Sequence, residues 1–152
     1  MSCAGTAASG ARMPSGRTRF AFFDTSVYIE NFRTGRFTPQ ILQSDFIPRC
    51  SSVVLHELLR GARARLEVRF VRDLLKRCRI VTPTESQWMQ AAEVLSAIRR
   101  REHYEVGKIR DLAFDVLIAL SARSIGATVI TSNVVDFRAI RRHLRFDVLY
   151  WE

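Results

Sequence analysis

Four carboxylates stand where the sequence is otherwise apolar. Asp24 follows the run FAFF, and Glu57 interrupts SSVVLHELL. Asp115 interrupts LAFDVLIAL, and Asp136 stands in VITSNVVDF. A carboxylate in such surroundings costs free energy unless it is paired, caps a helix or holds a cation. These four residues are therefore the candidates for chemistry.

A set of four neighbouring carboxylates needs compensating charge. Two carboxylates about 4 Å apart repel each other by roughly 4 kcal/mol at an effective dielectric constant near 20, so the group requires either protons or a divalent cation. The three cysteines, Cys3, Cys50 and Cys78, form no CxxC pair and share no short spacing with a histidine, so neither a disulfide framework nor a zinc site is indicated. Oxygen ligands alone favour Mg²⁺ or Mn²⁺.

Three of the four carboxylates also have simpler explanations. Asp24 has the alternative role of capping the helix that follows it. Glu57 has the alternative of pairing with Arg60 or Arg63 on a solvated helix face. Asp136 has the alternative of being a surface turn residue. These alternatives remain open at the level of single residues, and the functional interpretation depends on all four acids meeting at one place.

The pattern of apolar runs predicts how the acids are positioned. Strands are expected at 19–23, 47–54, 79–83, 127–131 and 145–151, and helices at 25–33, 55–78 with a break near Gly61, 84–102, 109–126 and 133–143. Strands that alternate with helices predict an α/β domain with a mainly parallel central sheet flanked by helices. Ligand sites of such sheets gather at the carboxyl ends of the strands, where Asp24, Glu57 and Asp136 are all expected.

Asp115 is the most anomalous of the four acids. It must come from a helix whose apolar residues surround it on nearly every side. A buried, unpaired aspartate is rare. Asp111 lies one helical turn earlier and has a simpler role, because an acid near the start of a helix interacts favourably with the helix dipole.

The composition predicts one folded domain with a basic surface. The chain has 152 residues, 47% of them hydrophobic, and a formal net charge of +9. Residues 1–18, rich in Ala, Gly and Ser, are predicted to be a flexible basic tail, and 19–152 to be the folded domain; Met13 is an alternative start. Without the three arginines of the first 19 residues, 21 of the 24 basic residues remain against 15 acidic ones. The folded part is therefore basic itself, which favours nucleic acid or an acidic protein as a partner.

The sequence lacks the signals of a membrane or secreted protein. No apolar run approaches the roughly 18 residues that span a bilayer, and the N-terminus lacks the apolar segment of a secretory signal. A cytoplasmic setting without membrane contact is therefore expected.

Several segments together resemble the PIN-domain ribonucleases, and within them the VapC-type toxins of bacterial toxin–antitoxin pairs. The matching segments are FDTSVYIE, SSVVLHELLRGA, IVTPTESQWMQAAEVLSAIRR and DVLIALSARSIGATVITSNVVDF. Their order and spacing make the resemblance specific, and it covers residues 19–151. It implies a PIN-like fold and a metal-dependent endoribonuclease that uses Mg²⁺ or Mn²⁺.

The resemblance also assigns roles to individual residues. Asp24, Glu57 and Asp115 match the first three acidic positions of the family. The fourth position falls on either Asn133 or Asp136, of which we favour Asp136, with Asn133 as a neutral oxygen ligand or a supporting donor. Asp24 and Asp115 are then expected to hold the metal, with Glu57 and Asp136 acting through water.

The resemblance also concerns residues next to the four acids, and one of them differs from the family pattern. The resemblance suggests that the hydroxyls of Ser26 and Thr131 support the carboxylates. Phe114 stands where the family commonly has an asparagine, which removes a polar support next to Asp115. Trp88 and Trp151 are expected in the core because each lies within an apolar periodic pattern.

The resemblance further implies partners, and it leaves rival functions. It implies an RNA substrate, with transfer RNA the common expectation, a cognate antitoxin that covers the metal site, and a homodimer. The apolar surfaces of the helices after Glu57 and around Trp88 are the expected docking groove for the antitoxin. The rivals are a non-catalytic PIN-like module that binds RNA or protein, and a metal-dependent DNA nuclease. The arginine-rich segments are expected to bind phosphates if they flank the acidic edge.

Overall fold

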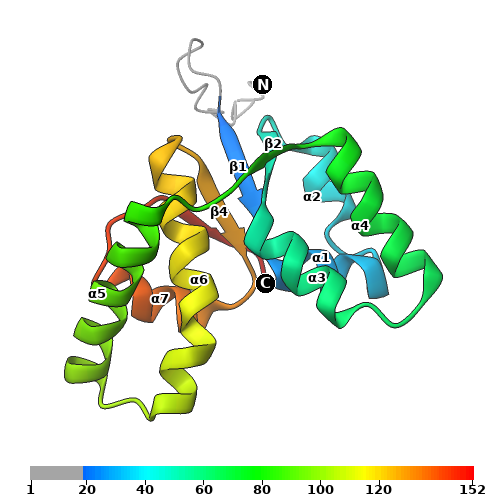
Figure 1. Cartoon of the computed structure of the whole chain (residues 1–152). Helices are drawn as coiled ribbons and strands as arrows, with labels where there is room; N and C mark the ends of the chain where they lie inside the picture. The colour runs from blue at the N-terminus through cyan, green and yellow to red at the C-terminus, as the bar shows by residue number, and fades with distance from the viewer. Residues whose placement is uncertain (1–18) are drawn as a thin grey trace, which may run out of the picture.

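Five parallel strands form the centre of the computed structural model, which describes residues 19–152 (Figure 1). Their order in the sheet is β3-β2-β1-β4-β5, and every neighbouring pair is parallel. The strands are β1 (Phe20–Phe23), β2 (Ile47–Ser51), β3 (Arg79–Val81), β4 (Thr128–Thr131) and β5 (Val148–Tyr150). The predicted α/β fold is thereby confirmed, whereas the predicted tail lies outside the described residues.

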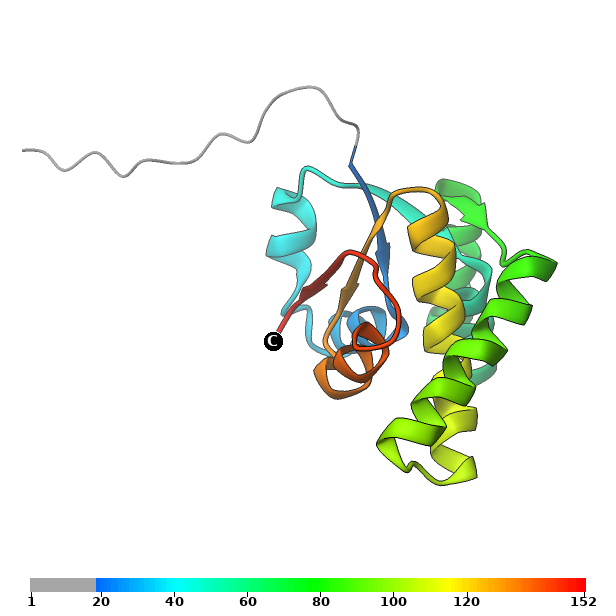
Figure 2. The ribbon, with the colours of Figure 1, turned by 90° about the vertical axis from the view of Figure 1, so that its left-hand side faces the viewer.

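Helices connect the strands and cover the sheet. They are α1 (Thr25–Thr34), α2 (Thr38–Gln43), α3 (Ser52–Gly61), α4 (Arg65–Arg77), α5 (Glu85–Glu102), α6 (Val106–Ser124) and α7 (Val134–Arg141). In Figure 1, α1 to α4 lie to the right of the sheet and α5 to α7 to the left. Figures 1 and 2 both show α5 and α6 packed side by side as a projecting pair. Within residues 19–152, no helix combines the length and apolarity needed to cross a bilayer.

Local sequence signals explain several helix ends. Thr84 Oγ1 accepts from the Gln87 backbone N–H at 3.2 Å while Gln87 Oε1 accepts from the Thr84 N–H at 3.0 Å, so a reciprocal cap starts α5. Ser51 Oγ accepts from the Val53 N–H and starts α3. Gly126 follows α6 with a φ of 67°, a conformation that glycine adopts without strain.

Three local features differ from the sequence prediction. The helix α2 was not predicted, because its six residues are too few to show helical periodicity. Helix α3 begins at Ser52, whereas the apolar run was assigned to the strand up to residue 54; the cap at Ser51 turns the chain earlier. Trp88 is 52% exposed rather than buried, because Gln87 occupies the buried position of that first turn of α5.

The core is built around α6 and the two central strands. Helix α6 contacts β1, β4, α3, α5 and α7, which explains why it is apolar on nearly all sides. Trp151 packs against Phe23 and Phe37, each with ring centroids 5.6 Å away. The largest fully buried side chains are Phe22, Phe37, Phe137, Ile98, Leu112, Leu117, Ile118, Leu120, Ile130, Ile140, Val27 and Val54.

The strand order places a topological switch between β1 and β4. The chain adds β2 and β3 on one side of β1, and then β4 and β5 on the other side. The connections that leave β1 and β4 therefore diverge, and parallel sheets bind ligands in the crevice that this opens at the carboxyl ends of the strands. Asp24 directly follows β1, and Thr131 is the last residue of β4.

Candidate active site

Asp24 occupies the centre of the switch point. It is only 3% exposed, and its Oδ2 accepts hydrogen bonds from Ser26 Oγ at 2.8 Å and from Thr131 Oγ1 at 2.9 Å. Asp24 stands at the N-cap position of α1, yet its side chain makes no capping hydrogen bond. Burial raises its pKa although the two hydroxyls act in the opposite direction. The simple capping role does not explain this carboxylate.

The two hydroxyls join the loops that leave β1 and β4. Ser26 Oγ accepts from the Ser132 backbone N–H at 3.2 Å, and Thr131 Oγ1 accepts from the Asn133 N–H at 3.0 Å. The hydroxyl oxygens of Ser26 and Thr131 lie 3.3 Å apart. Asp24 is therefore fixed by two hydroxyls that backbone N–H groups after β4 hold in place, which is the kind of support that the resemblance suggests for Ser26 and Thr131.

Glu57 approaches the same edge from α3. Its Oε1 is buried and has no hydrogen-bond partner among the described residues, and the same holds for Thr25 Oγ1. Burial raises the pKa of Glu57 to about 7, and the neighbouring Asp24 raises it further, while Arg60 lowers it. The alternative of a solvated ion pair does not hold, because no ion pair of Glu57 occurs in residues 19–152.

Asp115 faces the other acids from the middle of α6. Burial raises its pKa to about 8, and Asp24, Glu57 and Asp136 add to the rise because their charges repel a second negative charge. Lys108 lowers it. Asp115 therefore lies within electrostatic range of the other three predicted acids, and we refer to Asp24, Glu57, Asp115 and Asp136 as the acidic cluster.

Phe114 takes a packing role next to this residue. Its ring meets the edge of the His56 ring with centroids 5.6 Å apart, and the Arg60 guanidinium lies 5.8 Å from its centroid. His56 is exposed. In place of the polar support that an asparagine would give, Phe114 provides an aromatic packing contact between α6 and α3.

Asp136 lies at the outer side of the acidic cluster, at the start of α7. Its Oδ1 accepts from Lys108 Nζ at 2.5 Å, and its Oδ2 accepts from Asn133 Nδ2 at 3.1 Å. Asn133 also caps α7, since its Oδ1 accepts from the Asp136 backbone N–H at 3.4 Å. The amide of Asn133 therefore bonds and orients the carboxylate of Asp136.

Lys108 is the residue at this site that sequence reasoning missed. It lies seven positions before Asp115, so both project from the same face of α6 two turns apart. The spacing of seven residues was the signal in the sequence that could have revealed Lys108. It was overlooked because a lysine in the first turn of a helix is usually solvated. Asp111, between them in sequence, is exposed, which agrees with its simpler role.

The donor set fits an oxygen-coordinated divalent cation. Burial raises the pKa of Asp24, Glu57 and Asp115, so their charged forms lack compensation, and Glu57 Oε1 lacks any partner. Within residues 19–152, no group of three His, Cys, Asp or Glu side chains is arranged so that it could hold a metal ion without movement.

An apolar groove adjoins the acidic cluster at Glu57. It lies between α1, α3 and α4, and its walls include the exposed Ile29 and Phe32. The Phe70 ring packs against Tyr28 and Phe32, with centroids 5.8 Å from each. The groove therefore leads from an apolar surface to the partly buried carboxylate of Glu57.

Comparisons with known proteins agree with this architecture. VapBC-1 from nontypeable Haemophilus influenzae is 21% identical, with 87% of this chain and 98% of that chain covered and a TM-score of 0.64. DNA-bound VapBC from Salmonella typhimurium is also 21% identical, with 88% and 99% covered and a TM-score of 0.64. A toxin–antitoxin complex from Klebsiella pneumoniae is 24% identical, with 77% and 89% covered and a TM-score of 0.54.

These structures establish the fold that the chain shares. Among curated protein sequences, none matches the chain significantly. The family model of the PIN domain matches residues 21–142, which include the whole acidic cluster. The chain therefore belongs to the PIN domain family.

Proposed function

We propose that this protein is a Mg²⁺- or Mn²⁺-dependent endoribonuclease. The observation that carries the proposal is that Asp24, buried at the switch point of the sheet, lies within electrostatic range of the partly buried Glu57 and Asp115. None of the three has a cationic partner bonded to it in residues 19–152. Membership of the PIN domain family supports it. A protein gains nothing in stability from such a group, so a bound cation is its best explanation.

Each acid has a role that follows from its surroundings. Asp24 and Asp115 would hold the cation, Asp24 with its position fixed by two hydroxyls and Asp115 by the packing of α6. Glu57 and Asp136 would bind through water and orient the attacking water molecule. The chemistry that Mg²⁺ or Mn²⁺ supplies in such a site is neutralisation of charge at the phosphate and acidification of a water molecule.

The reaction would be hydrolysis of an RNA phosphodiester bond. The water oxygen forms a bond to phosphorus, the bond from phosphorus to one ribose oxygen breaks, and that oxygen takes up a proton. The rigid placement of Asp24 and the orienting contact of Asn133 on Asp136 would keep the acids in position during this exchange. Transfer RNA is the substrate that we propose to test first.

The same proposal includes the role of a toxin controlled by an antitoxin. The chain has the fold of the VapBC structures and of a toxin–antitoxin complex. The apolar groove beside Glu57 would take the apolar face of an antitoxin segment, and a basic side chain of that segment would meet the acidic cluster. The protein would act as a homodimer, as the resemblance implies.

Cleavage by Asp115→Asn tests the proposal, with Asp111→Asn as its matched control. Both replace an acid of α6 by its amide, one within the acidic cluster and one on the surface. We expect purified Asp115→Asn to cleave tRNA at least about 100-fold more slowly with Mg²⁺ present, because it loses a charged ligand for the cation that stabilises the charge at the reacting phosphate. Asp111→Asn should cleave like the parent.

Two outcomes would count against the proposal. Full Mg²⁺-dependent cleavage by Asp115→Asn would remove this residue from the site. Absence of cleavage by the parent protein on total RNA, together with no stabilisation by Mg²⁺ or Mn²⁺, would favour the non-catalytic binding module.

A further inference from the structure

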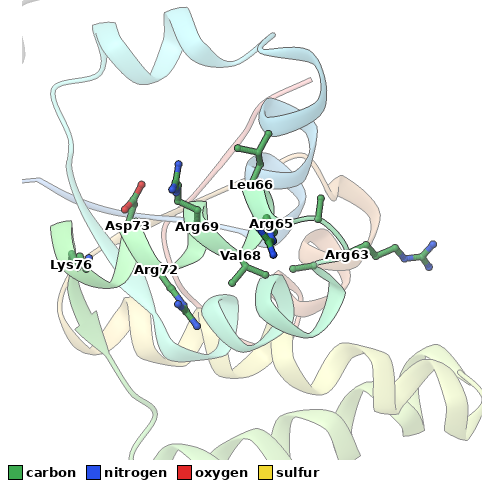
Figure 3. A pocket seen from close by; sticks show the side chains of 10 residues that line it. Arg63, Arg65, Leu66, Val68, Arg69, Arg72, Asp73 and Lys76 are labelled. Carbon is green, nitrogen blue, oxygen red and sulfur yellow. The ribbon is translucent and has the colours of Figure 1, made fainter.

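A basic surface covers the outer side of α4. Five cationic side chains and one carboxylate line an open hollow of about 760 Å³ there. Figure 3 shows Arg65 and Arg72 along the helix, with Arg63 at one end of the hollow and Lys76 at the other. We call these cations, together with Arg69, the basic face of α4. The one carboxylate in the hollow is Asp73.

The sequence of α4 explains why these cations share one side. Arg65, Arg69, Arg72 and Lys76 follow the spacing i, i+4, i+7 and i+11, which places them on one helical face. The opposite face carries the buried Val71 and the partly buried Phe70 and Leu74, which pack against the core. The row from residue 65 to residue 76 extends over about 16 Å at the rise of an α-helix.

Within the described part of the chain, other side chains do not neutralise or cover the cations of the basic face. None of the five forms an ion pair or lies over an aromatic ring among residues 19–152. Other arginines differ: Arg142 pairs with Glu102 at 2.8 Å, and Arg138 lies over the ring of Tyr150. The neighbouring acid Glu67 accepts backbone hydrogen bonds from Arg63 and Ala64 instead.

The basic face is continuous with the acidic cluster. Ala62 lines both the hollow on α4 and the groove that contains Glu57. The turn that joins α3 to α4 begins after Gly61, one helical turn beyond Glu57, and Arg63 lies in that turn. A chain bound at the acidic cluster can therefore continue over Arg63 and onto α4.

We propose that the basic face of α4 binds the phosphodiester backbone of the single-stranded RNA that flanks the scissile bond. This inference rests on the proposed function of the acidic cluster. Arginine forks bind phosphate oxygens in pairs, and a row of exposed cations at helical spacing suits a ligand with regularly repeated charge. Backbone contacts of this kind position the strand and carry no sequence information.

The test uses an Asp115→Asn parent in EDTA, so that the RNA stays intact and binding is measured without catalysis. The variant is Arg65→Gln, Arg69→Gln and Arg72→Gln combined. The matched control is Arg99→Gln, Arg100→Gln and Arg101→Gln, which removes the same charge from exposed positions at the end of α5. Binding of a fluorescein-labelled single-stranded RNA of about 20 nucleotides, long enough to reach past α4, is followed by anisotropy over a series of salt concentrations.

We expect the α4 variant to bind at least about tenfold more weakly and its salt slope to fall by about 2, since each phosphate contact to a single strand contributes about 0.7. The α5 control should keep the RNA affinity and the salt slope of the parent. Circular dichroism and the melting temperature check that each variant folds. The inference is overturned if the α4 variant binds RNA like the parent, or if the α5 control loses as much RNA affinity as the α4 variant.

A third arm separates RNA from an acidic protein partner. A polyglutamate peptide of equal charge should bind the parent more weakly than the RNA does. The RNA assignment would be overturned if the peptide bound the parent as tightly as the RNA and lost this affinity in the α4 variant. The cleavage test of the proposed function is independent of these arms. A cleaving Asp115→Asn protein would refute the acidic cluster, and unchanged RNA binding by the α4 variant would refute only the basic face.

Discussion

The two halves of the acidic cluster are held in different ways. At the switch point, Asp24 is bonded to Ser26 and Thr131, whose hydroxyls accept hydrogen bonds from two backbone N–H groups of the segment after β4. On the side of α6, Asp115 forms no ion pair within residues 19–152, and Lys108, the cation that lowers its pKa, is bonded to Asp136 instead. The first half is organised by hydrogen bonds and the second is left with uncompensated charge. The fold thus holds Asp24 rigidly with hydrogen bonds and leaves the charge of Asp115 without a bonded partner.

The largest expected effect concerns the uncompensated half and its dependence on pH. Burial and mutual repulsion raise the pKa of Asp115 to about 8 and that of Glu57 to about 7, from ordinary values of 3.8 and 4.5. Between the ordinary and the raised values, the folded state binds protons that the unfolded state has released, so the stability of the metal-free protein falls as the pH rises from about 4 to about 8.

Urea unfolding in EDTA measures this effect. The free energy of unfolding should be lower at pH 8 than at pH 5 by more than about 1 kcal/mol, since one pKa unit corresponds to about 1.4 kcal/mol. Asp115→Asn should reduce the difference. A metal-free protein that is equally stable at both pH values would show that the acids of the cluster do not repel one another.

A smaller effect is expected in the organised half. Thr131→Val keeps the shape of a fully buried side chain but removes the hydroxyl that donates to Asp24 and accepts from the Asn133 N–H. We expect a loss of about 1–3 kcal/mol in the free energy of unfolding, because buried partners lose their hydrogen bonds. Thermal and urea unfolding in EDTA measure it. Ser124→Ala, which removes a hydroxyl bonded within α6 and away from the acids, is the control.

The smallest effect is expected for Lys108→Met. The Lys108 and Asp136 side chains are 38% and 16% exposed, so their ion pair contributes about 1 kcal/mol or less to stability. Lys108 also lowers the pKa of Asp115, so its removal should shift the pH midpoint of Mg²⁺ binding upwards. Calorimetric titration over pH 6–9 checks this, and an unchanged midpoint would mean that Lys108 does not act on Asp115.

The sequence predicted most of what positions the acidic cluster. Asp24, Glu57 and Asp115 were found because a charge that interrupts an apolar run is visible in one dimension, and parallel strands place their carboxyl ends at one edge. The contact between Lys108 and Asp136 was not predictable in this way, since it joins α6 to α7 and depends on how the two helices pack. The exposure of Trp88 was missed for the same reason: periodicity predicts a face, whereas packing decides which residues of that face are covered.

The most direct test of the central claim is a Mn²⁺ titration of the parent, Asp115→Asn and Asp111→Asn at pH 8, followed by the melting temperature. A cation that binds only the folded state stabilises it by about 2.7 kcal/mol at 100 times its dissociation constant. The parent and Asp111→Asn should gain this stabilisation with Mn²⁺, while Asp115→Asn should start more stable than the parent in EDTA and gain little. Equal stabilisation of all three proteins, or of none, would contradict the assignment of the acidic cluster as a metal site.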